Sequence, residues 1–226
     1  MTEIRADGGP VPAYVSLPPS GSGPGVVVIQ EWWGLVPHIR DVADRLAAEG
    51  FVAIAPDLYR GAQTSEPDEA GKLVMEMRLD QAARDMGGAV DALLAMPETT
   101  GSGVGVIGFC VGGGLALYLA SLEPEVAAAV CYYGFPRPGL EWDLSTVKGA
   151  VLGHFAEDDD FAPRELADQM EQELRDAGVG VTFHHYPGTA HAFFNDDRPE
   201  VHDAEAADLS WRRTLDFLRG TLGGGS

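Results

Sequence analysis

The sequence predicts an α/β fold, with a mostly parallel central sheet and helices on both of its faces. Short apolar segments rich in β-branched residues recur along the chain, and such continuous runs are typical of strands buried on both faces. Amphipathic segments with helix start and stop signals separate them. Because parallel strands are joined by crossovers that are usually helices, this alternation favours a parallel sheet.

The strands of the sheet are expected at the apolar segments. They span residues 25–30, 51–56, 104–109, 127–133, 149–155 and 181–186. A weaker period-two pattern at residues 12–18 predicts antiparallel pairing at one edge of the sheet.

The helices are expected at the amphipathic segments between the strands. They cover residues 38–50, 66–96, 115–120, 163–178 and 203–220. The segment 66–96 is predicted to be either one broken helix or two. The segment 163–178 starts with proline and ends at glycine, which is the usual asymmetry of a helix.

The length of the chain bounds its domain organisation. With 226 residues and 45% hydrophobic content, it suffices for one domain with a substantial core and is too short for two full ones. We therefore expect residues 1–220 to form a single domain. The glycine-rich end, residues 221–226, is expected to be a flexible tail.

The chain is strongly acidic. Lys and Arg number 15 against 35 Asp and Glu, and the net charge of −20 repels nucleic acid and anionic membrane surfaces. No stretch approaches the roughly 20 apolar residues that cross a bilayer, and residues 1–10 lack the pattern of a signal peptide. We therefore expect a cytoplasmic protein with no nucleic-acid or membrane partner. Its two cysteines, Cys110 and Cys131, are expected to be free thiols.

The stretch GVGVIGFCVGGG, residues 103–114, admits two interpretations. Residues 103–108 match GxGxxG, but the dinucleotide-binding fingerprint needs an apolar strand before its first glycine, and MPETTGS stands there instead. Residues 108–112 match GxCxG, the cysteine counterpart of the GxSxG nucleophile elbow. They directly follow an expected strand and precede an expected helix, so the context favours the elbow.

An elbow would make Cys110 a nucleophile. Glycines two residues to either side give the strained turn room for close packing, and the N-terminus of the following helix favours a thiolate. The backbone N–H of Val111 would donate to a developing oxyanion. The alternative is that Cys110 is one more buried thiol, which is the better interpretation of Cys131 in the middle of its strand.

A nucleophile elbow needs an acid and then a histidine downstream. His191 follows the strand 181–186 on a glycine-containing loop. The loop after strand 149–155 carries acids that could orient an imidazole, although some of them are expected to be solvated charges. These acids are Glu157, Asp158, Asp159 and Asp160. The other histidines lack a spacing such as HExxH, so no metal site is predicted.

A set of motifs, in this order and at these separations, gives a family resemblance: QEWWG, APDLY, GFCVGG, FAEDDDFAP and YPGTAHAF. Over nearly its whole length the chain closely resembles the dienelactone hydrolase family. The GFCxGG motif with a downstream HAF is specific, because most α/β-hydrolases carry serine at the elbow. The resemblance implies the α/β-hydrolase fold and a carboxylic ester hydrolase similar to carboxymethylenebutenolidase.

The resemblance also implies a catalytic triad of Cys110, Asp159 and His191. Asp159 matches the family acid because the residues after it lead to a small apolar residue and a proline, Ala162 and Pro163. Asp158 remains the competitor by one position.

Two further roles follow from the QEWWG motif. The resemblance implies that Glu31 pairs with the resting thiol and moves or takes its proton when substrate binds. A loop carboxylate without this role is the alternative. Trp32 would supply a second oxyanion N–H beside that of Val111.

The implied reaction is acyl transfer. The Cys110 thiolate attacks a lactone or activated ester, a cysteinyl ester forms, and water activated by His191 releases the acid. Asp159 would hold the productive tautomer of the imidazole, and no cofactor is needed. The partner is then a small-molecule lactone or ester, such as a dienelactone.

The family prototype binds a substrate carboxylate with two arginines. Here Asn195 occupies the second position, and Arg60 is shifted by one residue from the first. Both are candidates for substrate binding. Trp33, Tyr59 and Phe193 are candidates to line an apolar pocket, and core packing is the alternative for each of them.

Other functions fit parts of the pattern. The same triad suits another carboxylesterase or a thioesterase. A protein with this fold but without catalytic activity would be a ligand-binding module. An accessible thiol of low pKa would suit a redox sensor. The expected oligomeric state is a monomer or a weak homodimer.

Overall fold

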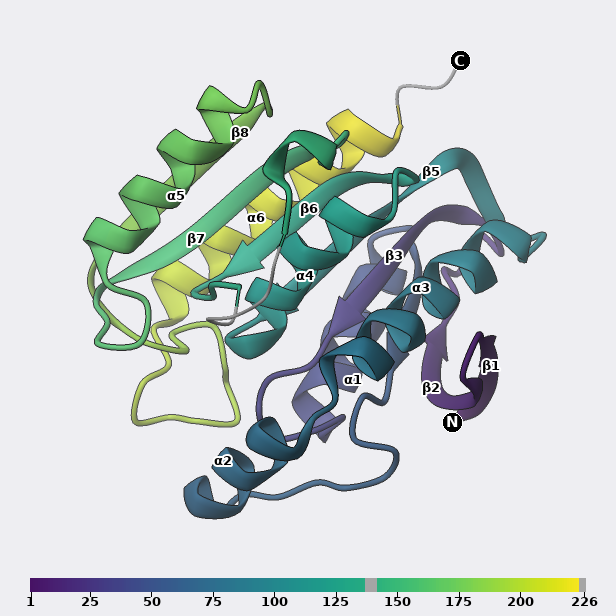
Figure 1. The fold of residues 1–226 in the computed structure, drawn as a ribbon, viewed down its shortest axis with the longest axis horizontal. Helices are drawn as coiled ribbons and strands as arrows, with labels where there is room; N and C mark the ends of the chain where they lie inside the picture. The colour runs from purple at the N-terminus through teal and green to yellow at the C-terminus, as the bar shows by residue number, and fades with distance from the viewer. Residues whose placement is uncertain (137–141, 224–226) are drawn as a thin grey trace.

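The structure is a computed structural model that describes residues 1–136 and 142–223 (Figure 1). Its elements in chain order are β1 Thr2–Ala6, β2 Gly9–Ser16, β3 Gly23–Ile29, α1 Pro37–Ala48, β4 Val52–Pro56, α2 Pro67–Glu76, α3 Leu79–Ala95, β5 Thr99–Phe109, α4 Val111–Leu122, β6 Val126–Tyr132, the 3-10 turn η1 Leu144–Thr146, β7 Ala150–Asp158, α5 Arg164–Asp176, β8 Val181–Ala190 and α6 Ala204–Leu222.

The described residues form an eight-stranded sheet in the order β1-β2-β4-β3-β5-β6-β7-β8. Neighbouring strands from β4 to β8 are parallel, and β1 and β2 add antiparallel pairs at one edge. The predicted α/β fold and its antiparallel edge are therefore confirmed. β1 was not predicted, because only two of its five residues are buried and its sequence carries little hydrophobic pattern.

Helices cover both faces of the sheet. α3 and α4 contact each other and lie in front of the sheet in Figure 1, whereas α6 passes behind it. α1 shares the face of α6, since Arg219 in α6 pairs with Glu49 at the end of α1. The central strands are consequently buried on both sides, and Val26, Val27 and Ile29 of β3 have no exposed surface.

Several expected boundaries differ from the observed ones. The segment 66–96 is two helices, because Met77 and Arg78 between them adopt extended backbone angles. α6 continues through residues 221 and 222, which were expected in the tail, and residues 224–226 lie outside the described ones. β7 and β8 are longer than expected, because pairing resumes after a register shift and joins Asp158 to Ala190. Asp158 is therefore the last residue of a strand rather than part of a loop.

A buried polar network links α6 to the sheet. His154 in β7 has no exposed surface, and its Nδ1 and Nε2 lie 2.8 Å from the Tyr186 hydroxyl and 3.0 Å from Thr214 Oγ1. The Tyr132 hydroxyl lies 2.9 Å from the same Thr214 oxygen. Burial, reinforced by the nearby His184 and Arg213, lowers the pKa of His154 well below its ordinary value. His154 is therefore neutral in the folded protein.

This network makes stability depend on pH. The unfolded chain takes up a proton at His154 below about pH 6.5, whereas the folded chain does not, so the stability present above that pH is lost as the pH falls. When the pH falls from about 7.5 to about 5, protonation of His154 in the unfolded chain is expected to lower the free energy of unfolding by up to about 2 kcal/mol. Urea unfolding of the wild type and of His154→Gln measures it. The variant has no group that titrates at this position, so its free energy of unfolding should fall by about 2 kcal/mol less over the same pH range. Equal losses in both proteins would contradict a neutral, buried His154.

Candidate active site

Cys110 occupies a sharp turn between β5 and α4, with φ 55° and ψ −121°. A positive φ strains any residue with a Cβ, and such strain persists only where surrounding structure enforces it. The turn depends on the flanking glycines. A Cβ on Gly108 would collide with the carbonyl oxygen of Gly112, and one on Gly112 would lie 2.7 Å from the carbonyl oxygen of Ile29 in β3. Without these side chains, the start of α4 packs directly against the end of β3.

Cys110 is the residue that directly precedes the first turn of α4. The N–H groups of Gly113 and Gly114 bond to the carbonyl oxygen of Cys110, at 2.9 and 3.4 Å. Val111 is the first residue of the helix, so its N–H has no partner within the helix. The positive end of the helix dipole therefore lies beside the thiol, with a backbone donor available to an anion.

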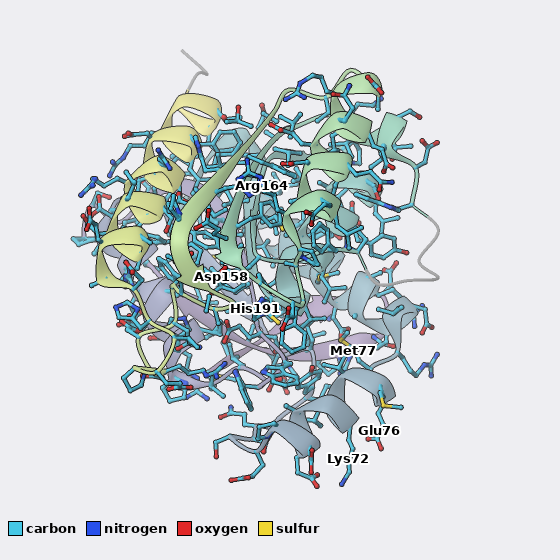
Figure 2. All side chains as sticks on the ribbon, turned by 90° about the vertical axis from the view of Figure 1, so that its left-hand side faces the viewer. Lys72, Glu76, Met77, Asp158, Arg164 and His191 are labelled. Atoms are coloured by element: carbon cyan, nitrogen blue, oxygen red, sulfur yellow. The ribbon has the colours of Figure 1, made fainter. Side chains whose placement is uncertain are left out.

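His191 follows β8 and pairs with Asp159, which follows β7. The Asp159 side chain is buried, and its Oδ2 lies 2.7 Å from His191 Nδ1. Its Oδ1 accepts hydrogen bonds from the backbone N–H groups of Phe161 and Ala162, each at 2.8 Å. Both carboxylate oxygens are thus fixed. Asp158 is exposed and lies near His191 at the same end of the sheet (Figure 2).

The charge state of His191 is set by two neighbours. Burial lowers the pKa of His191, but hydrogen bonds to Asp159 and Cys110, together with their negative charges, outweigh this and raise it to about 10. The rings of Tyr133 and Phe161 flank the imidazole, with centroids 5.0 and 5.1 Å away. The arrangement favours an imidazolium held by the Asp159 carboxylate.

Glu31 follows β3 and is only 1% exposed. Its Oε2 accepts a hydrogen bond from Asn195 Nδ2 at 2.7 Å, and its Oε1 accepts a longer one from the Tyr133 hydroxyl at 3.4 Å. Burial and the charge of Glu31 raise the pKa of Tyr133 well above its ordinary value, which keeps the phenol protonated as a donor. We expected Glu31 to pair with the resting thiol of Cys110, and the structure pairs it with Asn195 and Tyr133 instead.

These groups meet at a pocket of about 360 Å³. Cys110, His191 and Glu31 contribute to its wall, and the indole rings of Trp32 and Trp33 pack edge to face beside them with centroids 4.8 Å apart. The pocket is large enough for a small ester and offers mostly apolar walls with a few polar groups, which is typical of small-molecule sites.

Not all predicted substrate-binding residues reach this pocket. Trp33 lines it, but Tyr59 and Arg60 line a separate pocket of about 310 Å³ beside α2 and α3. The Arg60 guanidinium lies 2.8 Å from Asp85, whose side chain is 1% exposed, and 3.0 Å from the carbonyl oxygen of Pro10. A buried carboxylate needs such a cation. The expectation that Arg60 binds substrate is therefore corrected to a structural ion pair.

Phe193 and Asn195 also differ from their predicted placement. Phe193 has no exposed surface and packs edge to face against Tyr133, with centroids 5.5 Å apart, so it belongs to the core. Asn195 is 2% exposed and directed at Glu31 rather than lining the pocket.

The lining of the pocket also includes residues that the sequence did not indicate, and two of them carry a charged or an aromatic side chain. Arg198 lines the pocket, and its guanidinium lies 5.7 Å from the centre of the Trp33 ring. Phe161 lines the pocket beside His191 and is 74% exposed. Both lie on loops, where no periodic pattern marks which side chains turn inward, so the sequence offered no signal for them.

The chain is similar to known proteins along nearly its whole length. Residues 11–222 match the model of the dienelactone hydrolase family. A protein called usf from Aquifex pyrophilus is 37% identical, and a protein named "Putative carboxymethylenebutenolidase" from Aquifex aeolicus is 35% identical, each over 97% of both chains.

Solved structures give the same result. A structure described as "Putative Dienelactone Hydrolase", from Klebsiella pneumoniae, is 31% identical over 96% of both chains, with a TM-score of 0.86. A dienelactone hydrolase-like promiscuous phosphotriesterase from metagenomic libraries is 27% identical over 98% of both chains, with a TM-score of 0.88. Within residues 1–136 and 142–223, no helix has the length and apolar character to cross a membrane. The chain belongs to the dienelactone hydrolase family, and it is a hydrolase with the α/β-hydrolase fold.

Proposed function

We propose that this hydrolase cleaves lactones or activated esters with a triad of Cys110, His191 and Asp159, through a covalent cysteinyl ester. The observation that supports the proposal is the strained turn at Cys110, which lines the same pocket as an imidazole held by a buried carboxylate. Strain of this kind is kept where function needs it.

The first half of the reaction forms the covalent intermediate. The Cys110 thiolate adds to the substrate carbonyl carbon, and the carbonyl oxygen becomes an oxyanion that accepts hydrogen bonds from the N–H groups of Trp32 and Val111. The intermediate then collapses and breaks the bond to the leaving oxygen. His191 gives its proton to that oxygen, and the acyl group remains on sulfur.

The second half releases the acid. His191 takes a proton from water, and the resulting hydroxide adds to the cysteinyl ester. Collapse of the second tetrahedral intermediate breaks the carbon–sulfur bond and restores the thiolate, while His191 is again protonated. Asp159 holds the imidazole in the tautomer whose Nε2 faces the reacting atoms and stabilises its charge. None of these steps requires a cofactor.

The thiol favours substrates with good leaving groups. From a tetrahedral intermediate, a thiolate is expelled more readily than an alkoxide, so an ordinary alkyl ester returns to starting material. An enol lactone such as a dienelactone, or an aryl ester, releases a more stable anion and goes forward. Arg198 lines the pocket and is paired with the exposed Glu200 at 2.8 Å, so a carboxylate-bearing lactone would compete with Glu200 for its guanidinium.

A substrate panel tests this proposal. Purified wild type is assayed with a dienelactone, a saturated lactone, an aryl ester, an alkyl ester and a thioester. We expect turnover of the dienelactone and the aryl ester at least about 100-fold faster, in kcat/KM, than that of the alkyl ester. A folded protein that binds these compounds and turns over none of them would support a ligand-binding module instead.

A further inference from the structure

We infer that the pocket favours esters whose leaving group carries a positive charge, and that Asp160 and Phe161 set this preference together with the charge of Asp158. The inference rests on the proposed function, because the leaving group is defined by that reaction. It names a class of substrate, which is esters of an aromatic or enolic alcohol that bears an ammonium group.

Two exposed carboxylates line the pocket close to His191. Asp158 pairs with Ala190 in the register of β7 and β8, and Ala190 directly precedes His191 (Figure 2). Asp160 directly precedes Phe161, whose ring centroid lies 5.1 Å from that of His191. In the proposed reaction His191 gives its proton to the leaving oxygen, so the leaving group lies on this side of the pocket.

Neither of these carboxylates is neutralised by the described part of the chain. No Lys, Arg or His side chain there forms an ion pair with Asp158 or Asp160. Arg164, four residues beyond Asp160, pairs instead with Asp168 at 3.5 Å. The negative charges therefore remain available to a ligand, and they attract a cation and repel an anion at the pocket mouth.

Phe161 supplies a second interaction of the same preference. Its side chain is 74% exposed although it lines the pocket, so much of the ring remains open to a ligand. The face of an aromatic ring attracts a cation that lies within about 6 Å of its centroid. An ammonium group beside His191 would therefore meet an aromatic ring and a carboxylate on neighbouring residues of one loop.

The other charged groups of the pocket do not reverse this preference. Among the described lining residues they are Glu31, His191 and Arg198. The positive charge of His191 is matched by Asp159, and that of Arg198 by Glu200 at 2.8 Å. The excess charge around the pocket is therefore negative, and a carboxylate on the leaving group is repelled.

A set of phenyl acetates tests the inference. The esters differ only at the meta position of the phenol, which carries trimethylammonium, its neutral isostere tert-butyl, or carboxylate. In each protein, kcat/KM for a charged ester is divided by that for the neutral one, so the intrinsic reactivity of the esters cancels between proteins. The cationic-to-neutral ratio should fall about 3-fold in Asp160→Asn and about 10-fold in Asp160→Lys, while the carboxylate-to-neutral ratio should rise by similar factors.

Two further variants separate charge from aromatic contact. Glu125→Gln removes the same charge from an exposed residue directly before β6, at the opposite end of the sheet, and should keep both ratios within about 1.5-fold of wild type. Phe161→Leu should lower the cationic ratio about 2-fold without raising the carboxylate ratio, because it removes the ring but no charge. About 0.5 M NaCl should shrink the differences between wild type and the Asp160 variants.

The inference is overturned if the cationic-to-neutral ratio is the same in wild type and both Asp160 variants, or if Glu125→Gln changes it equally. Calorimetric binding of phenyltrimethylammonium, which has no ester bond, decides the preference without turnover. Weaker binding to Asp160→Lys than to wild type supports it, and equal binding contradicts it. A wild type that hydrolyses none of the esters would refute the proposed function, whereas turnover with unchanged ratios would refute only the charge preference.

Discussion

Replacement of Cys110 by alanine is expected to lower kcat/KM for an aryl ester by about 10⁴-fold or more, while the protein remains folded. The substitution removes the only atom on which the proposed covalent intermediate forms. Binding and the backbone donors remain, and they account for the residual rate. Steady-state kinetics on the aryl ester, with circular dichroism to confirm folding, measure the effect.

The second cysteine provides a matched control. Cys131 in β6 is fully buried, burial raises the pKa of its thiol to about 12, and its Sγ donates to the carbonyl oxygen of Gly134. Cys131→Ser retains a donor at that position and should keep kcat/KM within about 3-fold of wild type. A Cys110→Ala variant that hydrolyses the ester at the wild-type rate would exclude Cys110 as the nucleophile.

The second large effect is expected at Asp159. Asparagine at this position is expected to lower kcat by about 10³- to 10⁴-fold, because an amide that donates to Nδ1 selects the wrong tautomer of His191. It also removes a carboxylate that raises the pKa of His191, so the imidazole should titrate at lower pH than in the wild type. Aryl ester kinetics measure the first effect, and NMR titration of His191 measures the second.

Asp158→Asn is the comparison for this variant. Asp158 precedes Asp159 by one residue, lines the same pocket and is exposed. Its substitution changes one charge near the site but leaves the His191 imidazole held, so kcat should stay within about 3-fold of wild type. Comparable losses in the two variants, or a greater loss in Asp158→Asn, would mean that the paired carboxylate is not the one that orients the base.

The fold and the elbow were predictable because their signals are local. Continuous apolar runs identify buried strands, and GxCxG between a strand and a helix requires only neighbouring residues. The acid that contacts His191 was harder to identify from sequence. Its position depends on the register shift that pairs Asp158 with Ala190 and on the N–H groups of Phe161 and Ala162, none of which has a sequence pattern.

Trp33 lines the pocket as predicted, but the other residues predicted to bind substrate lie elsewhere, for a related reason. Arg60 has a φ of 52°, and its guanidinium pairs with Asp85 in α3, a contact between segments that only the tertiary structure joins. In HAFFN, the aromatic Phe193 turns into the core while Asn195 turns toward Glu31. Loop residues have no fixed period, so their directions follow from packing rather than from spacing.

Detection of the cysteinyl ester on Cys110 tests the proposed mechanism most directly. Wild type is mixed with an aryl ester whose acyl group is released slowly, quenched in acid within the first turnover and measured by intact and peptide mass spectrometry. A mass increase equal to one acyl group is expected on the peptide that contains Cys110, and no such increase is expected in Cys110→Ala. Product formation without any acylated protein, or an acyl group on a different residue, would contradict it.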